Sequence, residues 1–182
     1  MREVQLDTLE KVFTQLTLTA FDSTVNRNRS SLLFRGLPNV NYKLMTSLCR
    51  NCKGKAVELE ASILRNFSKY SVSSGPLHSC WEQLAIGQHH GLPTRLMDWT
   101  YSPLAALHFA TSGEDFTMMD QHDAVIWAID INEINALLPI KYQEILKEES
   151  AYLFTIDMLE KIADNLITYD DDMKSDSMVL LE

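Results

Sequence analysis

The densest group of chemically active side chains in the sequence lies between Gln88 and Thr100. These thirteen residues include two histidines, an arginine, a carboxylate, an amide and two hydroxyls. Gly91 and Pro93 shape the backbone in the middle of the group. Titratable side chains next to a glycine and a proline that set the backbone path are typical of a binding or catalytic loop on a rigid scaffold. We therefore expect this block to contact a ligand.

Arg35 is a second candidate, because it ends a short apolar run and precedes Gly36. A guanidinium at a strand end suits bidentate binding of phosphate or carboxylate. Gly36 would allow a ligand or another backbone to come close. The structural alternative for Arg35 is an internal ion pair, for example with Asp98.

Within the block, the residues that we favour as ligand contacts are Gln88, His89, Thr94 and Arg95. An imidazole titrates near neutral pH and suits an acid, a base or a donor to a ribose hydroxyl. The alternative for His89 is a structural role at a helix end. Asp98 is expected to order the loop.

The composition is that of a globular protein, with 182 residues, 46% hydrophobic and 23% charged. No apolar run reaches the roughly 18–20 residues of a membrane span, and the N-terminus lacks an apolar signal region. Three cysteines indicate reduced thiols, which favours a soluble, cytoplasmic protein. Cys49 and Cys52, with His78 or Cys80, form too weak a pattern to predict zinc, so we predict no metal site.

The net charge of −9 is unevenly distributed along the chain. Residues 1–100 carry 12 Lys/Arg against 8 Asp/Glu, whereas residues 101–182 carry 4 against 17. The basic side is densest in segment 27–69, which suits a nucleic-acid or protein partner. Alternatively, the two halves of the chain pack together and neutralise each other.

Hydrophobic periodicity and turn residues predict an α+β fold, with helices around a small mixed sheet. The predicted helices cover 4–18, 55–70, 79–88 and a buried segment 103–110 that begins at Ser102-Pro103. A further helical stretch is predicted at 144–147 and another at 155–166. The predicted strands cover 31–35, 123–131 (buried on both faces) and 177–181, and 22–30 and 71–76 are predicted loops. Residues 1–30 are expected to be an N-terminal helix and loop, and 31–182 a domain truncated at its C-terminal end.

Two motifs resemble a known family. Phe34-Arg35-Gly36, and then the block 88–100 followed directly by Ser102 and residues 103–110, resemble the FRG domain, which occurs mostly in bacterial and phage proteins. The family has no assigned activity. Its motif order is similar to that of ADP-ribosyltransferases with an arginine, a serine or threonine, and a glutamate. The glutamate-type motif would be missing here or lie past Glu182.

This resemblance implies an ADP-ribosyltransferase-like domain that takes NAD as its substrate. It implies catalytic roles for Arg35, His89 and Thr94. It also implies NAD contacts from a wider set, namely Arg35, Gly36, Gln88, His89, Arg95 and Ser102. The alternative is a non-enzymatic nucleic-acid- or protein-binding module that uses segment 27–69, in bacterial or phage defence.

Overall fold

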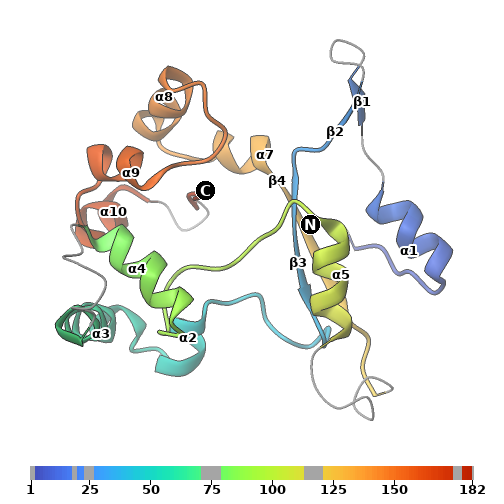
Figure 1. Ribbon diagram of the computed structural model, residues 1–182, viewed down its shortest axis with the longest axis horizontal. Helices are drawn as coiled ribbons and strands as arrows, with labels where there is room; N and C mark the ends of the chain where they lie inside the picture. The colour runs from blue at the N-terminus through green and yellow to red at the C-terminus, as the bar shows by residue number, and fades with distance from the viewer. Residues whose placement is uncertain are drawn as a thin grey trace. The chain divides into compact units, whose positions relative to one another are not determined.

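The computed structural model consists of short helices and two antiparallel strand pairs (Figure 1). It describes residues 3–17, 20–22, 27–70, 79–112, 121–173 and 178–181. Two compact units make up the chain, and each combines two separate segments. The first unit contains Met1–Tyr42 and Trp99–Asp130, and the second contains Lys43–Asp98 and Ile131–Glu182. The predicted α+β class is confirmed.

The first unit begins with helix α1 (Leu9–Leu16) and the pair β1 (Ala20–Asp22) and β2 (Arg27–Arg29). Helix α1 starts later than the predicted helix 4–18, because Thr8 caps it by accepting from the Lys11 amide. The predicted loop 22–30 was wrong for residues 27–29, which pair with β1; residues 23–26 lie outside the described residues.

The centre of the first unit is the pair β3 (Leu32–Leu37) and β4 (Val125–Asp130). Its antiparallel register runs from Leu32 opposite Asp130 to Leu37 opposite Val125. On the edge of β3 that does not pair with β4, Phe34 exchanges two backbone hydrogen bonds with Thr100, of 2.8 and 2.9 Å. Both sheets among the described residues are antiparallel, where we had expected a mixed sheet.

Helix α5 (Pro103–Thr111) packs along β3 (Figure 1), with Ala106 and Phe34 in a small core. The predicted cap is confirmed, since Ser102 accepts from the Ala105 amide. The expectation of a wholly buried helix was wrong, because Leu104 is 53% and Phe109 62% exposed. Ala106 and Ala110 face the strand, Leu107 packs at the edge of the same core, and Leu104 and Phe109 face away. Strand β4 is half-buried apart from exposed Ala128, so the prediction of burial on both faces was also wrong.

The second unit is helical. Its elements are α2 (Ser47–Cys52), α3 (Ala56–Tyr70), α4 (Cys80–His89), α7 (Ile131–Ala136), α8 (Ile140–Glu148), α9 (Ile156–Ile162) and α10 (Leu166–Asp172). Its core joins α3, α4, α8 and α9 through buried residues that include Trp81, Leu84, Tyr142, Phe154 and Leu159. The Trp81 indole N–H donates to the Ala163 carbonyl at 2.7 Å, which satisfies the polar atom of this buried ring.

Predictions near the chain end were less accurate. The predicted helix 144–147 is part of the longer α8, and a break between α9 and α10 divides the predicted helix 155–166. In place of a strand at 177–181, Leu181 forms one isolated parallel bridge with Phe154. Residues 71–76 and 177 lie outside the described residues. Within the described ranges, no helix is long and apolar enough to span a membrane.

Candidate functional site

The block 88–100 begins at the C-terminal end of α4, and a left-handed glycine turns the chain there. Gly91 has a φ of +82°, and its amide donates to the Gln88 carbonyl at 2.9 Å. The Leu92 amide donates to the Gly87 carbonyl at 2.8 Å, which satisfies another terminal carbonyl of the helix. Gly91 therefore ends α4, as the sequence predicted.

Thr94 is fully buried, with an exposed fraction of 0%. Its hydroxyl donates to the side-chain oxygen of Gln88, and the side-chain amide of Gln88 donates to Asp98. Ser47 joins the Thr94 backbone to α2, because its hydroxyl accepts from the Thr94 amide at 3.1 Å. Gln88 and Thr94 are thus brought together. Their contacts hold the loop that follows α4 against α2.

Arg95 lies between two carboxylates from distant helices. Its Nε donates to both oxygens of Glu60 in α3, at 2.8 and 3.0 Å, and its Nη2 also binds Glu60. Its two terminal nitrogens bind Asp170 in α10, at 2.5 and 3.1 Å. We call these three side chains the Arg95 cluster.

The Arg95 cluster is partly desolvated, since Glu60 is only 3% exposed. Burial by itself would lower the pKa of Arg95, but hydrogen bonds to Glu60 and Asp170 outweigh it and raise that pKa. The guanidinium also lies over the Tyr169 ring, 5.9 Å from its centroid. Arg95 therefore ties together α3, α10 and the loop, and a ligand would have to compete with two carboxylates for it.

His89 is exposed, as are His90 and Gly91 beside it, whereas Thr94 is buried and Gln88 and Arg95 are half-buried. The His89 ring is edge-on to that of His90, with the ring centroids 5.8 Å apart. The ring centroids of His90 and of Phe67 in α3 are 6.4 Å apart. Of the four residues favoured in this block, His89 is the one whose side chain is open to solvent.

Arg35, Gly36 and Ser102 belong to the first unit, on β3 and at the start of α5. A Cβ atom on Gly36 would come within 1.8 Å of the Ala106 carbonyl oxygen and 2.8 Å of the Ala110 amide nitrogen. Gly36 is thus needed for close packing of α5 on β3. Ser102 caps that helix, so its hydroxyl is also engaged.

Arg35 lies on the opposite face of the sheet from α5. Because neighbouring residues in a strand alternate between faces and Gly36 faces α5, Arg35 faces away from it. Its register partner in β4 is Trp127, and residues directly opposite in an antiparallel pair share a face. Arg35 and Trp127 are both half-buried.

Sequence reasoning missed Trp127, whose indole Nε1 is buried and has no hydrogen-bond partner among the described residues. A buried N–H without an acceptor is rare and needs an explanation. Trp127 stands in a predicted strand, but its register opposite Arg35 cannot be read from the sequence. Glu60 was also missed, although it lies four residues before buried Leu64 on the inner face of α3.

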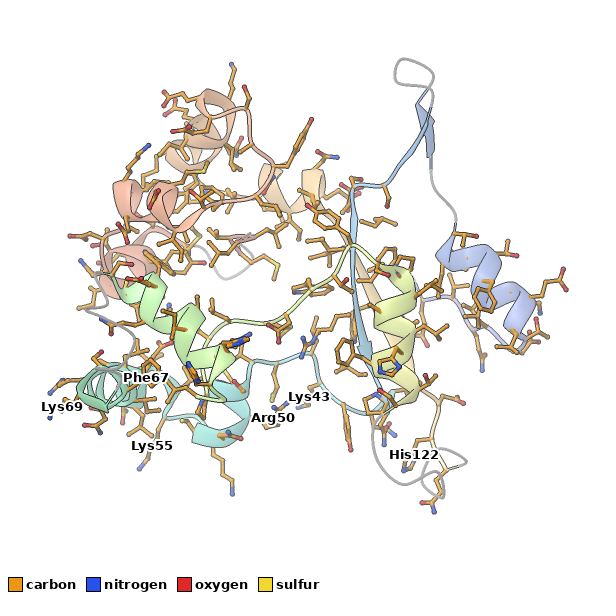
Figure 2. The ribbon with its side chains drawn as sticks, viewed as in Figure 1. Lys43, Arg50, Lys55, Phe67, Lys69 and His122 are labelled. Carbon is orange, nitrogen blue, oxygen red and sulfur yellow. The ribbon has the colours of Figure 1, made fainter. Side chains whose placement is uncertain are left out.

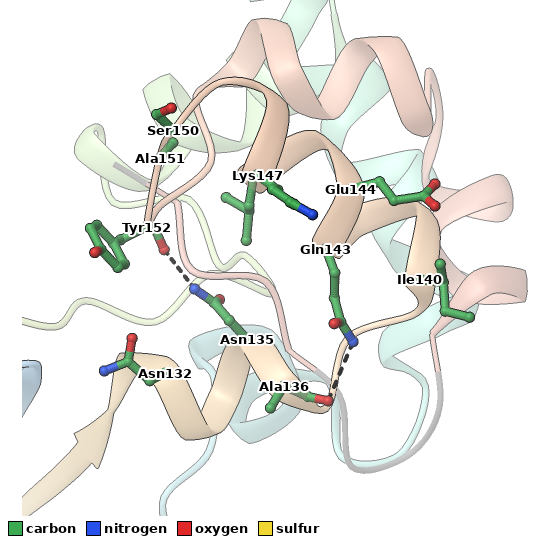
Figure 3. Close-up of a pocket in the computed structure, with 11 residues that line it drawn as sticks. Asn132, Asn135, Ala136, Ile140, Gln143, Glu144, Lys147, Ser150, Ala151 and Tyr152 are labelled. Carbon is green, nitrogen blue, oxygen red and sulfur yellow. Dashed lines mark hydrogen bonds between the residues drawn. The ribbon is translucent and has the colours of Figure 1, made fainter.

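The second unit has a pocket of about 630 Å³ between α7, α8 and residues 150–152 (Figure 3). Asn135 lines it and donates to the Tyr152 carbonyl at 2.9 Å, while its buried side-chain oxygen has no partner in the described chain. Lys147 and Glu144 supply one charge of each sign. No residue singled out in the sequence lines this pocket, and its lining does not favour a phosphate.

Within the described ranges, no group of three or more His, Cys, Asp or Glu side chains is arranged to hold a metal ion. Cys49, Cys52 and Cys80 are free thiols, and His78 lies outside the described residues.

Comparison with known families identifies the region that contains both motifs. Residues 30–117 match the model of the FRG domain. The chain contains an FRG domain. Among curated proteins and among solved structures, no significant match to the chain was found. The FRG domain of this chain includes β3, α2, α3, α4 and α5, and thus every residue that the sequence singled out as a ligand contact.

Proposed function

We propose that the FRG domain of this chain binds a phosphate-bearing nucleotide, with NAD as the substrate of an ADP-ribosyltransferase-like reaction. The observation that supports this proposal is the pairing of Arg35 with Trp127 on one sheet face. A guanidinium fork suits the diphosphate of NAD, and an indole suits a flat heteroaromatic ring. The Trp127 N–H, which has no acceptor among the described residues, would be satisfied by a ligand oxygen.

The reaction would transfer the ADP-ribosyl group from nicotinamide to an acceptor. The bond between ribose C1′ and the nicotinamide nitrogen breaks, an acceptor oxygen or nitrogen bonds to C1′ and loses its proton, and nicotinamide leaves. Positive charge develops on the ribose as the bond breaks, so polar groups around it would accelerate the step. Catalytic roles for His89 and Thr94 stay predictions, and for Thr94 Gln88 would have to release the hydroxyl.

Calorimetric titration of the full chain with NAD, ADP-ribose and AMP tests the proposal. Arg35→Lys keeps the charge and loses the fork, so we expect about tenfold weaker binding or more. Arg50→Lys is the matched control, because Arg50 is an exposed arginine of α2, and it should bind like the wild type. Release of nicotinamide from NAD would report the transfer step separately from binding.

Trp127→Phe provides a second readout. It keeps an aromatic ring and removes the unpartnered N–H. We expect binding to weaken about fivefold, corresponding to about 1 kcal/mol, while the free protein keeps or gains thermal stability. If a correctly folded wild type binds none of the three nucleotides at about 1 mM, or if Arg35→Lys and Arg50→Lys behave alike, the proposal fails.

A further inference from the structure

The surface of α2 and α3 in the second unit is strongly basic. Segment 43–69 contains six lysines and arginines and two glutamates, Glu58 and Glu60. Glu60 is buried against Arg95, so Glu58 is the remaining carboxylate on this surface. All six cations are exposed, namely Lys43, Arg50, Lys53, Lys55, Arg65 and Lys69.

None of these six side chains forms an ion pair with another residue that the structure describes, whereas lysines elsewhere in the same unit do. Lys141 binds Asp172 at 2.5 Å, and Lys161 binds Glu149 at 3.0 Å. The acidic side chains of 131–172 thus do not neutralise these six cations by direct pairing. This observation argues against the alternative in which the charge asymmetry of the chain is cancelled internally.

The fold explains why these cations gather on one surface. Glu60 and Leu64 mark the buried face of α3, and Arg65 and Lys69, one turn apart, are exposed. The α2–α3 turn adds Lys53, which has a left-handed φ of 45°, and Lys55. Figure 2 shows Arg50, Lys55 and Lys69 beside α2 and α3, with Lys43 on the segment that leads into α2.

We infer that this α2–α3 surface binds the phosphate backbone of a nucleic-acid duplex. Lys55 and Lys69 are 14 positions apart, which is about 21 Å along a helix and spans several phosphates of a duplex. The described residues of segment 43–69 present no exposed aromatic ring on which unpaired bases could stack, unlike typical single-strand binders. The core of a protein interface would instead be poor in lysine and rich in aromatic side chains.

The inferred contacts involve charge alone, so the binding would not depend on base sequence. It would weaken steeply with salt, because each phosphate that a lysine or arginine neutralises releases a counterion. The inference is independent of the proposed nucleotide site, since Arg35 and Trp127 belong to the other unit.

Fluorescence anisotropy of the full chain with labelled duplexes of DNA and RNA tests this inference. The test variant replaces Arg50, Lys53 and Lys55 with glutamine. The matched control replaces Lys141, Lys147 and Lys161 with glutamine, which changes the net charge of the same unit by the same amount. All six positions are exposed, so both variants should fold, which circular dichroism checks.

We expect the wild type and the control to bind duplex with affinities that agree within about threefold. We expect the test variant to bind about tenfold more weakly or worse, with the slope of log K against log salt smaller in magnitude by about 2–3. The duplex that binds more tightly identifies the nucleic acid. Three results would overturn the inference: no duplex binding at about 50 mM salt, equal losses in both variants, or equal binding of a poly-glutamate of matched charge, which would indicate an acidic protein partner.

Discussion

The Arg95 cluster allows a direct comparison of two carboxylates that bind one guanidinium from different environments. The Glu60 side chain is 4% exposed, whereas that of Asp170 is 45% exposed. Glu60→Gln and Asp170→Asn each remove one negative charge and keep the size of the side chain. The difference between the two variants therefore measures how much burial strengthens the interaction with Arg95.

The expected magnitudes follow from the two environments. Removing one partner of a buried ion pair costs about 3–5 kcal/mol, because the other charge stays desolvated. After Glu60→Gln, Asp170 still binds Arg95 and the glutamine oxygen can accept one hydrogen bond, so we expect a smaller loss of about 2–3 kcal/mol. Water screens the half-exposed Asp170, so Asp170→Asn should cost about 0–1 kcal/mol.

Urea unfolding of the full chain, followed by far-ultraviolet circular dichroism and tryptophan fluorescence, measures these differences. Coincident transitions would justify a two-state comparison of the free energies of unfolding. In a chain of this size, the loss predicted for Glu60→Gln corresponds to a Tm lowered by about 4–12 °C. The reasoning is refuted if Asp170→Asn costs as much as Glu60→Gln, or if Glu60→Gln leaves the free energy of unfolding unchanged.

Two further predictions concern packing and pH. Gly36→Ala should lower the free energy of unfolding by about 3 kcal/mol or more, because the new Cβ would meet the Ala106 carbonyl oxygen. If the Gly36→Ala variant unfolds in urea with the free energy of the wild type, α5 can move away from β3 at little cost and the prediction is wrong. The hydrogen bond from Lys141 lowers the pKa of Asp172 below its ordinary value, so this contribution to stability is present at neutral pH and lost as pH falls through the folded pKa. Asp172→Asn should therefore lower the Tm at about pH 6 and match the wild type at about pH 2, and a difference in Tm that does not change with pH would contradict this.

The elements that sequence predicted well are those whose signals lie within a few residues. Ser102-Pro103 starts α5, and Ser79 caps α4 by accepting from the Glu82 amide at 3.1 Å. Gly91 ends α4 in the left-handed conformation that favours glycine. In each case a side chain or a φ preference acts on backbone groups beside it, so no knowledge of the tertiary structure is required.

The candidate site was harder to predict, because its contacts join residues far apart in the chain. Arg95 pairs with Glu60 and Asp170, which are 35 and 75 positions away, and nothing near Arg95 in the sequence indicates either. The amide of Gln88 and the hydroxyl of Thr94 looked like ligand contacts, but each found a partner within the protein. Helix α5 is almost wholly apolar, with no clear polar face, so its sequence could not show that Phe109 is exposed.

Both units of this chain are assembled from discontinuous segments, which separates the region recognised by sequence from the region needed for folding. The FRG match ends at residue 117, before β4 (Val125–Asp130), the hydrogen-bonded partner of β3. It also ends before Tyr142 and Phe154, which share a core with Trp81. A fragment cut at residues 30 and 117 would therefore expose an unpaired strand edge and apolar helix faces, both of which promote aggregation. Failure of such a fragment to bind a ligand would reflect lost folding and not a missing activity.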